Sequence, residues 1–318
     1  MHLGNVFCAL LSWLSAKSQG GEWVLRIEDL DPQRSREEYA LQLMDDLQWL
    51  GLPWDGEPVW QSQRGHIYEE YLRHLTEMGL TYPCHCTRAD IMATQAPHET
   101  DGRVVYKGTC RPRDIDAIGA IGAIDSIGSI DSTIRTVPAT TRLIVPDRTI
   151  PFTDGHYGPH PLNLAEHCGD YIVRRKDGAW AYQLAVVVDD ALMGITEIVR
   201  GRDLLLSSPQ QIHLRELLFG ERKTDSLTTH HPPLTVNFFH HPLLCNAEGQ
   251  RLCKRDKSMD LGHLRNKGTT SQEIIGLLAH LASLTDTPAP ITPAELLPLF
   301  SWDKVPTEDI ILDKQIML

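Results

Sequence analysis

The sequence predicts an α/β protein in which helices cover a parallel sheet and a cysteine-containing subdomain interrupts the chain. Two observations lead to this class. Patterns typical of helices and of strands alternate through residues 3–78, as they do where crossover helices join parallel strands. Apolar core patterns return at residues 171–206, after a loop-rich segment that contains Cys84, Cys86 and Cys110.

The first predicted element is a helix at residues 3–17, where apolar side chains follow helical spacing up to the Gly20-Gly21 pair. Residues 22–28 then alternate between apolar and polar side chains, which predicts a strand. Two amphipathic helices are expected after it, around residues 37–50 and 65–78. Later helical patterns cover residues 204–219 and 271–284 in the same way.

No strand-like pattern precedes the first helix, so the sheet is expected to lack its first strand. A sheet without an inner strand exposes apolar surface and unpaired backbone groups. We therefore expect residues 1–318 by themselves to be poorly soluble or inactive.

An unusual repeat lies in the middle of the chain. Isoleucine recurs at every third position from Ile115 to Ile130, with only Gly, Ala, Asp and Ser between. A period of three fits neither an α-helix nor a strand. Residues 115–132 are therefore expected to form a low-complexity, flexible surface loop, with a short irregular helix as the alternative.

The composition predicts a cytoplasmic globular protein without membrane helices. No apolar stretch approaches the roughly 18 residues that a membrane helix needs, and the apolar residues 6–14 lack the preceding Lys or Arg of a secretory signal. The net charge of −12 excludes wholesale neutralisation of nucleic-acid phosphates, so any RNA contact needs a local basic patch. The odd number of cysteines, seven, favours metal ligands or buried thiols over disulfides.

Two segments have the chemistry to bind phosphates. His2 and Gly4 lie at the start of the first predicted helix, where backbone N–H groups and the positive end of the helix dipole suit a phosphate chain. Residues 250–258 form a basic loop in which Lys254 could place its charge on a triphosphate. Taken singly, these segments are better explained as an ordinary helix start and a solvated basic loop.

Taken together, the two segments resemble the signature motifs of class I aminoacyl-tRNA synthetases. His2-Leu-Gly is similar to the second half of the HIGH motif, and Arg251-Leu-Cys-Lys-Arg is similar to the KMSKS loop, with Arg251 and Cys253 departing from it. The resemblance implies a Rossmann-type catalytic domain that uses ATP with Mg²⁺. It also implies that His2 and Lys254 are catalytic and that His2, Gly4 and Lys254 bind ATP.

Two further segments resemble the glutamate-activating branch of this class. They are Arg26-Ile-Glu-Asp-Leu-Asp31 and the stretch from Tyr182 to Gly201. The resemblance implies that Glu28, Tyr182 and Arg200 bind L-glutamate. The residue types fit, since a carboxylate can hold an ammonium group and an arginine can clamp a carboxylate through two parallel hydrogen bonds.

The spacing of Cys84, Cys86 and Cys110 predicts a structural zinc site, which normally has four tetrahedral ligands. On chemistry alone His85 and His98 are both candidates for the fourth ligand. The Cys-x-Cys…Tyr-x-x-x-Cys pattern, however, is similar to that of the glutamyl-queuosine tRNA(Asp) synthetases, shortened paralogues of glutamyl-tRNA synthetase. That resemblance implies one Zn²⁺ per chain, with Tyr106 as the fourth ligand.

The same resemblance implies the reaction and the partners. The expected enzyme activates L-glutamate with ATP and transfers the glutamyl group to queuosine in the anticodon of tRNA(Asp), as a cytoplasmic monomer. The short chain after Lys254 favours this paralogue over a complete glutamyl-tRNA synthetase. Two alternatives stay open: a truncated enzyme that charges tRNA(Glu), and a non-catalytic paralogue that binds zinc and tRNA.

Four regions are expected along the chain. They are the first part of the catalytic domain, the zinc-containing insertion, the second part of the catalytic domain, and a helical region that opens with the KMSKS-like loop. Their predicted boundaries are 1–81, 82–165, 166–235 and 236–318.

Overall fold

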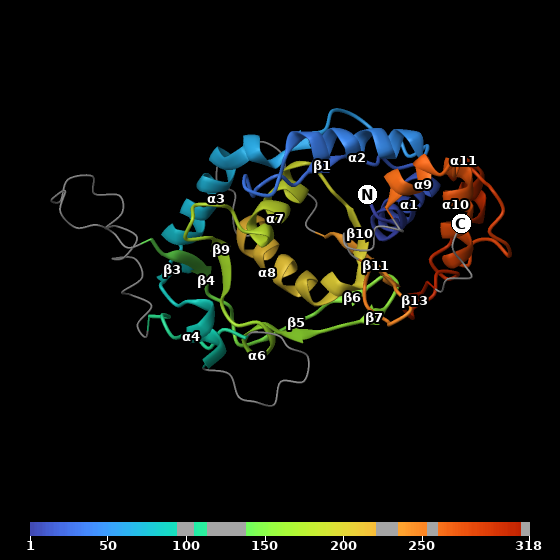
Figure 1. Ribbon diagram of the computed structural model, residues 1–318. Coiled ribbons are helices and arrows are strands. Elements are labelled where there is room, and N and C mark those ends of the chain that lie inside the picture. Colours follow the sequence, from blue (N-terminus) through green and yellow to red (C-terminus); the bar gives the residue numbers. More distant parts are fainter. Residues whose placement is uncertain (94–104, 113–137, 221–234, 253–259, 313–318) are drawn as a thin grey trace.

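The structure is a computed structural model that describes residues 1–93, 105–112, 138–220, 235–252 and 260–312. Helices and short sheets alternate, and both marked ends of the chain lie on the same side of the molecule (Figure 1). None of the helices in these ranges combines the length and the hydropathy needed to cross a membrane. The isoleucine repeat at 115–132 lies outside the described residues.

Helix α1 spans Leu3–Ser18, as the apolar spacing predicts. Its side chains at Val6, Phe7, Leu10 and Leu14 have no solvent exposure and belong to the larger of the hydrophobic cores. The same core takes in α10 (Ser271–Leu281), so the two ends of the described chain share one apolar interior.

Two pairs of parallel strands lie next to the helices that carry most of the core. Strand β1 (Arg26–Ile27) pairs with β2 (Val59–Trp60), and β10 (Glu197–Gly201) pairs with β11 (Asn237–His241). The strand expected over residues 22–28 is thus shorter than its alternating pattern. The strand is short because, among the described residues, β1 pairs with β2 alone. On its other side, residues 21–26 line a cavity.

Helices pack around these pairs. They are α2 (Glu37–Trp49), α3 (Gly65–Glu77), α7 (Tyr182–Leu192) and α8 (Ser208–Phe219), and the short 3-10 helices η1 (Gln61–Arg64) and η2 (Arg202–Ser207) precede α3 and α8. The apolar run at 184–188 belongs to α7, which is buried on all sides at these positions.

The fully buried carboxylate of Asp189 joins α7 to α3. It accepts hydrogen bonds from Gln61 Nε2 at 2.9 Å, Arg64 Nε at 2.6 Å and Tyr68 OH at 2.7 Å. These three donors satisfy a charge that would otherwise be costly in the interior. The polar cluster therefore fixes how the two helices pack.

The antiparallel part of the fold lies at the other end of the molecule (Figure 1). Strands β3 (Thr81–Cys84), β4 (Thr140–Leu143) and β9 (Tyr171–Arg174) form one sheet, which joins residues on both sides of the predicted boundary at 165. The smaller elements between β3 and β9 in the sequence are α4 (Arg88–Ala93), β5 (Thr149–Ile150), β6 (Thr153–Asp154), β7 (Gly158–Pro159), β8 (Leu162–Asn163) and α6 (Leu164–His167). Of these, β6 and β7 pair with each other beside β11 and away from the three-stranded sheet (Figure 1).

The C-terminal elements pack back onto α1. They are β12 (Leu244–Cys245), α9 (Leu261–Asn266), α10, α11 (Pro293–Leu296), the 3-10 helix η4 (Leu297–Leu299) and β13 (Ile310–Ile311). Trp302 donates from Nε1 to Ser15 Oγ at 3.0 Å, and Ser15 donates to Glu197 at 2.5 Å. The last part of the chain is thereby tied to both α1 and β10.

Replacing Asp189 by alanine should lower the free energy of unfolding by about 3–5 kcal/mol, because Arg64 would lose its buried partner. Urea unfolding followed by circular dichroism measures the change. Asp177→Ala is the control, because its ion pair with Arg175 is exposed and its loss should have little effect. Equal losses for the two variants would contradict this role of Asp189.

Candidate active site

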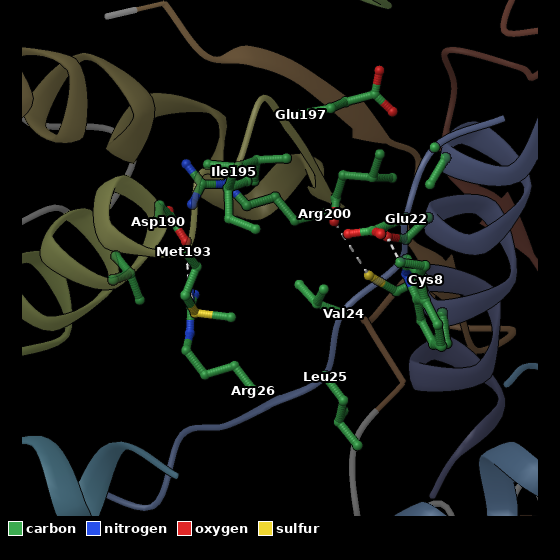
Figure 2. A pocket seen from close by; sticks show the side chains of 18 of the residues that line it. Cys8, Glu22, Val24, Leu25, Arg26, Asp190, Met193, Ile195, Glu197 and Arg200 are labelled. Carbon is green, nitrogen blue, oxygen red and sulfur yellow. Dashed lines mark hydrogen bonds and ion pairs between the residues drawn. The ribbon is translucent and has the colours of Figure 1, made fainter. Parts of the chain in front are cut away.

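A cavity of about 700 Å³ opens between α1, residues 21–28, α7 and β10 (Figure 2). Cys8 of α1 lies on one wall, across from Asp190 of α7. Glu28, Tyr182 and Arg200, the residues predicted to bind glutamate, all line this cavity. The fold thus brings together three side chains that come from the residue after β1, from α7 and from β10 and are far apart in the sequence.

Arg26 holds the acidic wall of the cavity in place. It donates from Nη1 to Asp190 Oδ1 at 2.6 Å and from Nη2 to Glu28 Oε1 at 3.1 Å. Loss of hydration raises the pKa of Glu28, and the charge of Arg26 opposes that rise. The pairing of Arg26 with Asp190 escaped the sequence prediction because the two residues are 164 positions apart.

Arg200 is a second basic group of the cavity, and only 8% of it is exposed. It donates from Nη1 to Tyr182 OH at 3.3 Å, from Nη2 to Ser208 Oγ at 2.9 Å and from Nε to His240 Nε2 at 3.1 Å. All three acceptors belong to side chains that are uncharged in this arrangement. In the part of the chain that the structure describes, Arg200 forms no ion pair with a carboxylate.

His2 and Gly4 lie at the start of α1, as predicted. His2 caps the helix, and its backbone N–H donates to Asn5 Oδ1 at 3.4 Å. A Cβ on Gly4 would approach the imidazole of His2 to 3.1 Å, so glycine leaves room for that ring. Helix starts of this kind offer backbone N–H groups to anions.

Lys254 lies outside the described residues, but the residues that flank 253–259 are described. Arg251 forms an ion pair with Asp203, next to η2. On the other flank, Leu261 donates its backbone N–H to the carbonyl oxygen of Met1 at 2.7 Å, and Asp260 forms a β-bridge with His2. Residues 260 and 261, which follow the segment that contains Lys254 in the sequence, therefore lie at the start of α1.

A separate cluster of thiols lies beside β3. The Sγ atoms of Cys84, Cys86 and Cys110 all lie within 4.8 Å of one another. The hydroxyl of Tyr106 is 3.4 Å from Cys84 Sγ and 3.9 Å from Cys86 Sγ, and the backbone N–H of Cys110 donates to it at 2.8 Å. Tetrahedral Zn–S bonds of about 2.3 Å place the sulfurs roughly 3.8 Å apart, so the cluster has a suitable size for a metal ion.

The charges and hydrogen bonds around Cys84 favour its ionised form, the thiolate. Burial opposes ionisation, but the hydrogen bond with Tyr106 and the nearby Arg142 together lower the pKa of Cys84 to about 7. Arg142 is buried and lies 3.7 Å above the Tyr106 ring. Of the two histidines considered as ligands, His85 is exposed and does not join the group of three cysteines, and His98 lies outside the described residues.

Comparison with known proteins identifies the class to which this chain belongs. The family model of the catalytic domain of class I tRNA synthetases for E and Q matches residues 1–289. A glutamate tRNA ligase from Elizabethkingia meningosepticum, solved in complex with its amino acid, aligns with a TM-score of 0.75 at 24% identity. The match covers 100% of this chain and 65% of that one, and it confirms the fold. The chain therefore belongs to the class I aminoacyl-tRNA synthetases, which confirms the expected class of ligase.

The sequence relatives narrow the family. The chain is 39% identical to a glutamyl-Q tRNA(Asp) synthetase of Nitratidesulfovibrio vulgaris over 326 residues, which are 100% of this chain and 93% of the relative. It is 41% identical to one of Symbiobacterium thermophilum, over 98% of this chain and 91% of the relative. Within its class, the chain belongs to the family of glutamyl-Q tRNA(Asp) synthetases.

Proposed function

We propose that the chain activates L-glutamate with ATP and transfers the glutamyl group to queuosine in the anticodon of tRNA(Asp). Arg200 carries this proposal. Its guanidinium is almost fully buried in a cavity wall, and its partners are neutral side chains, so its charge is available to a carboxylate ligand. The names of the relatives support queuosine in tRNA(Asp) as the acceptor.

Each predicted residue has a role in this proposal. Arg200 binds a carboxylate of the substrate, and Tyr182, which is 38% exposed beside it, donates or accepts a further hydrogen bond. Glu28 binds the α-ammonium group across the cavity. Because Arg26 contacts Oε1 of Glu28, the other carboxylate oxygen can face the substrate.

Activation takes place next to the start of α1. An oxygen of the glutamate α-carboxylate attacks the α-phosphorus of ATP, and the bond to the departing pyrophosphate breaks. His2 and Gly4 bind the phosphates of ATP with Mg²⁺, and Lys254 supplies positive charge as pyrophosphate forms. One flank of its loop supports this placement, since residues 260 and 261 contact residues 1 and 2. No protein nucleophile is needed, because positioning and charge stabilisation suffice.

In the second step, a hydroxyl of the queuosine base attacks the glutamyl carbonyl and AMP leaves. The product is an ester in the anticodon and not at the 3′ end of the tRNA. A cytoplasmic monomer suits this role, and we keep the regions 1–81, 82–165, 166–235 and 236–318 as its proposed organisation.

The cluster of Cys84, Cys86, Tyr106 and Cys110 is proposed to hold one Zn²⁺ per chain. Three sulfurs and one phenolic oxygen match the preference of zinc for four tetrahedral ligands. The ion, when bound, cross-links β3 to residues 105–112 and so stabilises the inserted region. The cluster belongs to a different hydrophobic core from the one that contains α1, which fits a structural role.

The acceptor is tested by offering the purified chain [¹⁴C]glutamate, ATP and either tRNA(Glu) or queuosine-containing tRNA(Asp). Under this proposal only tRNA(Asp) is labelled. Labelling of tRNA(Glu) would instead identify a tRNA(Glu)-charging enzyme. Labelling of either tRNA by the purified chain would also overturn the expectation that residues 1–318 by themselves are inactive. Binding of tRNA without any glutamate-dependent ATP–pyrophosphate exchange would identify the non-catalytic paralogue.

Arg200→Lys should raise the KM for glutamate about 10- to 100-fold, because the two-pronged hydrogen bond to a carboxylate is lost. Pyrophosphate exchange measures KM, and calorimetry with a non-hydrolysable glutamyl-adenylate analogue measures binding directly. Glu22→Gln is the control, since Glu22 lines the same cavity and should change KM by less than about twofold. A normal KM for Arg200→Lys would refute the assignment.

Zinc binding is tested by metal analysis of the purified protein, which should contain one Zn²⁺ per chain. Cys86→Ser should lose the metal, and Tyr106→Phe should bind it about tenfold or more weakly, because one of four ligands is gone. Cys168→Ser should retain it, since Cys168 donates to the carbonyl oxygens of Leu164 and Gly169 and does not belong to the group of three cysteines. If His85→Ala loses zinc and Tyr106→Phe does not, His85 is the fourth ligand.

A further inference from the structure

The side of Arg200 that faces away from the cavity contacts a buried histidine. His240 lies on β11, directly paired with Arg200 of β10 in the parallel register, and has no solvent exposure. Its Nε2 accepts the Nε–H of Arg200 at 3.1 Å and is 3.4 Å from Ser208 Oγ. His240 therefore touches the one guanidinium nitrogen that is neither of the two terminal nitrogens.

The imidazole is in turn fixed by a buried carboxylate. His240 Nδ1 is 2.6 Å from Asp154 Oδ2. The other oxygen of Asp154 accepts from the backbone N–H groups of His156 at 3.0 Å, Tyr157 at 2.9 Å and His240 at 3.3 Å. Asp154 belongs to β6, in the region inserted between β3 and β9, so a side chain of this region contacts His240, which in turn contacts Arg200.

These contacts define the tautomer of His240. A carboxylate can only accept, so Nδ1 carries the proton that bonds to Asp154. Nε2 then has its lone pair free to accept from Arg200, whose Nε can only donate. A protonated imidazole has no such lone pair, so the observed arrangement requires the neutral ring. Burial and the charge of Arg200 both lower the pKa of His240, in agreement with this state.

We propose that Asp154 and His240 are positioning residues that orient the Arg200 guanidinium for the carboxylate of the substrate. This inference rests on the proposed role of Arg200. The imidazole occupies Nε, and the aromatic ring of Phe238, 5.3 Å from the guanidinium carbon, limits its rotation. Each terminal nitrogen has a second N–H besides the one that bonds to Tyr182 or Ser208, and these two N–H groups can form a parallel pair of hydrogen bonds with a carboxylate. Such preorganisation lowers the cost of binding.

Two substitutions of His240 separate orientation from packing. In His240→Gln the side-chain amide reaches the position of Nε2 and can still accept from Arg200. In His240→Asn the amide reaches only the position of Nδ1, so the bond to Asp154 survives and the bond to Arg200 is lost. We expect His240→Asn to raise the KM for glutamate about tenfold, with kcat and the KM for ATP nearly unchanged, and His240→Gln to stay within about threefold of wild type.

A double-mutant cycle shows whether the effect passes through Arg200. Lysine has no Nε–H of this kind, so in an Arg200→Lys background His240→Asn should change the KM for glutamate by less than about twofold. Asp154→Asn is a second, independent variant and should raise the KM for glutamate in the native background. His241→Asn is the control, because His241 is buried on the same strand but bonds to Pro242. It should lower the melting temperature without changing the KM for glutamate.

The outcomes distinguish this inference from the proposed function. If Arg200→Lys raises the KM for glutamate while His240→Asn and His240→Gln behave alike, His240 has only a packing role and the inference is wrong. If Arg200→Lys itself leaves that KM unchanged, the role of Arg200 in glutamate binding is wrong. Additive effects of His240→Asn and Arg200→Lys would also refute the positioning role.

Discussion

The uncompensated charge of Arg200 is the constraint on which the candidate site depends. A guanidinium in a largely buried wall normally pairs with a carboxylate, as Arg26 does with Asp190. Arg200 instead has Tyr182, Ser208 and His240 as partners. These groups satisfy its geometry and leave its charge uncancelled. Under the proposed function, a carboxylate of the substrate supplies the negative charge that pairs with this guanidinium.

Some residues near Arg200 line the cavity, and others support the elements that form it. Arg26 and Asp190 compensate each other's charge and so fix the acidic side of the cavity. Behind them, the hydrogen bonds from residues of η1 and α3 to Asp189 hold α7 in place. The thiol cluster is remote from these contacts and belongs to another core. The residues proposed to bind the substrate are therefore separate from those proposed to stabilise the inserted region.

Sequence patterns predicted the helices well and the network around the site poorly. The apolar spacing that predicts a helix at residues 3–17 survives in the structure because α1 buries one continuous stripe. The alternation at 22–28 overstated β1, since strand length depends on a neighbour that local pattern cannot reveal. Glu28, Tyr182 and Arg200 were found through family resemblance. Asp154 and His240 were not, because a contact across 86 residues leaves no periodic signal.

The hydrogen bond from Trp302 to Ser15 links residues 287 positions apart. Helix α1 leaves the ribosome before Trp302, one of the residues that pack on its core, has been made. During synthesis, its apolar stripe must therefore wait without its final partners, a period in which a nascent chain is open to chaperones and to aggregation. The packing of α1 is therefore completed only after Trp302 has been synthesised.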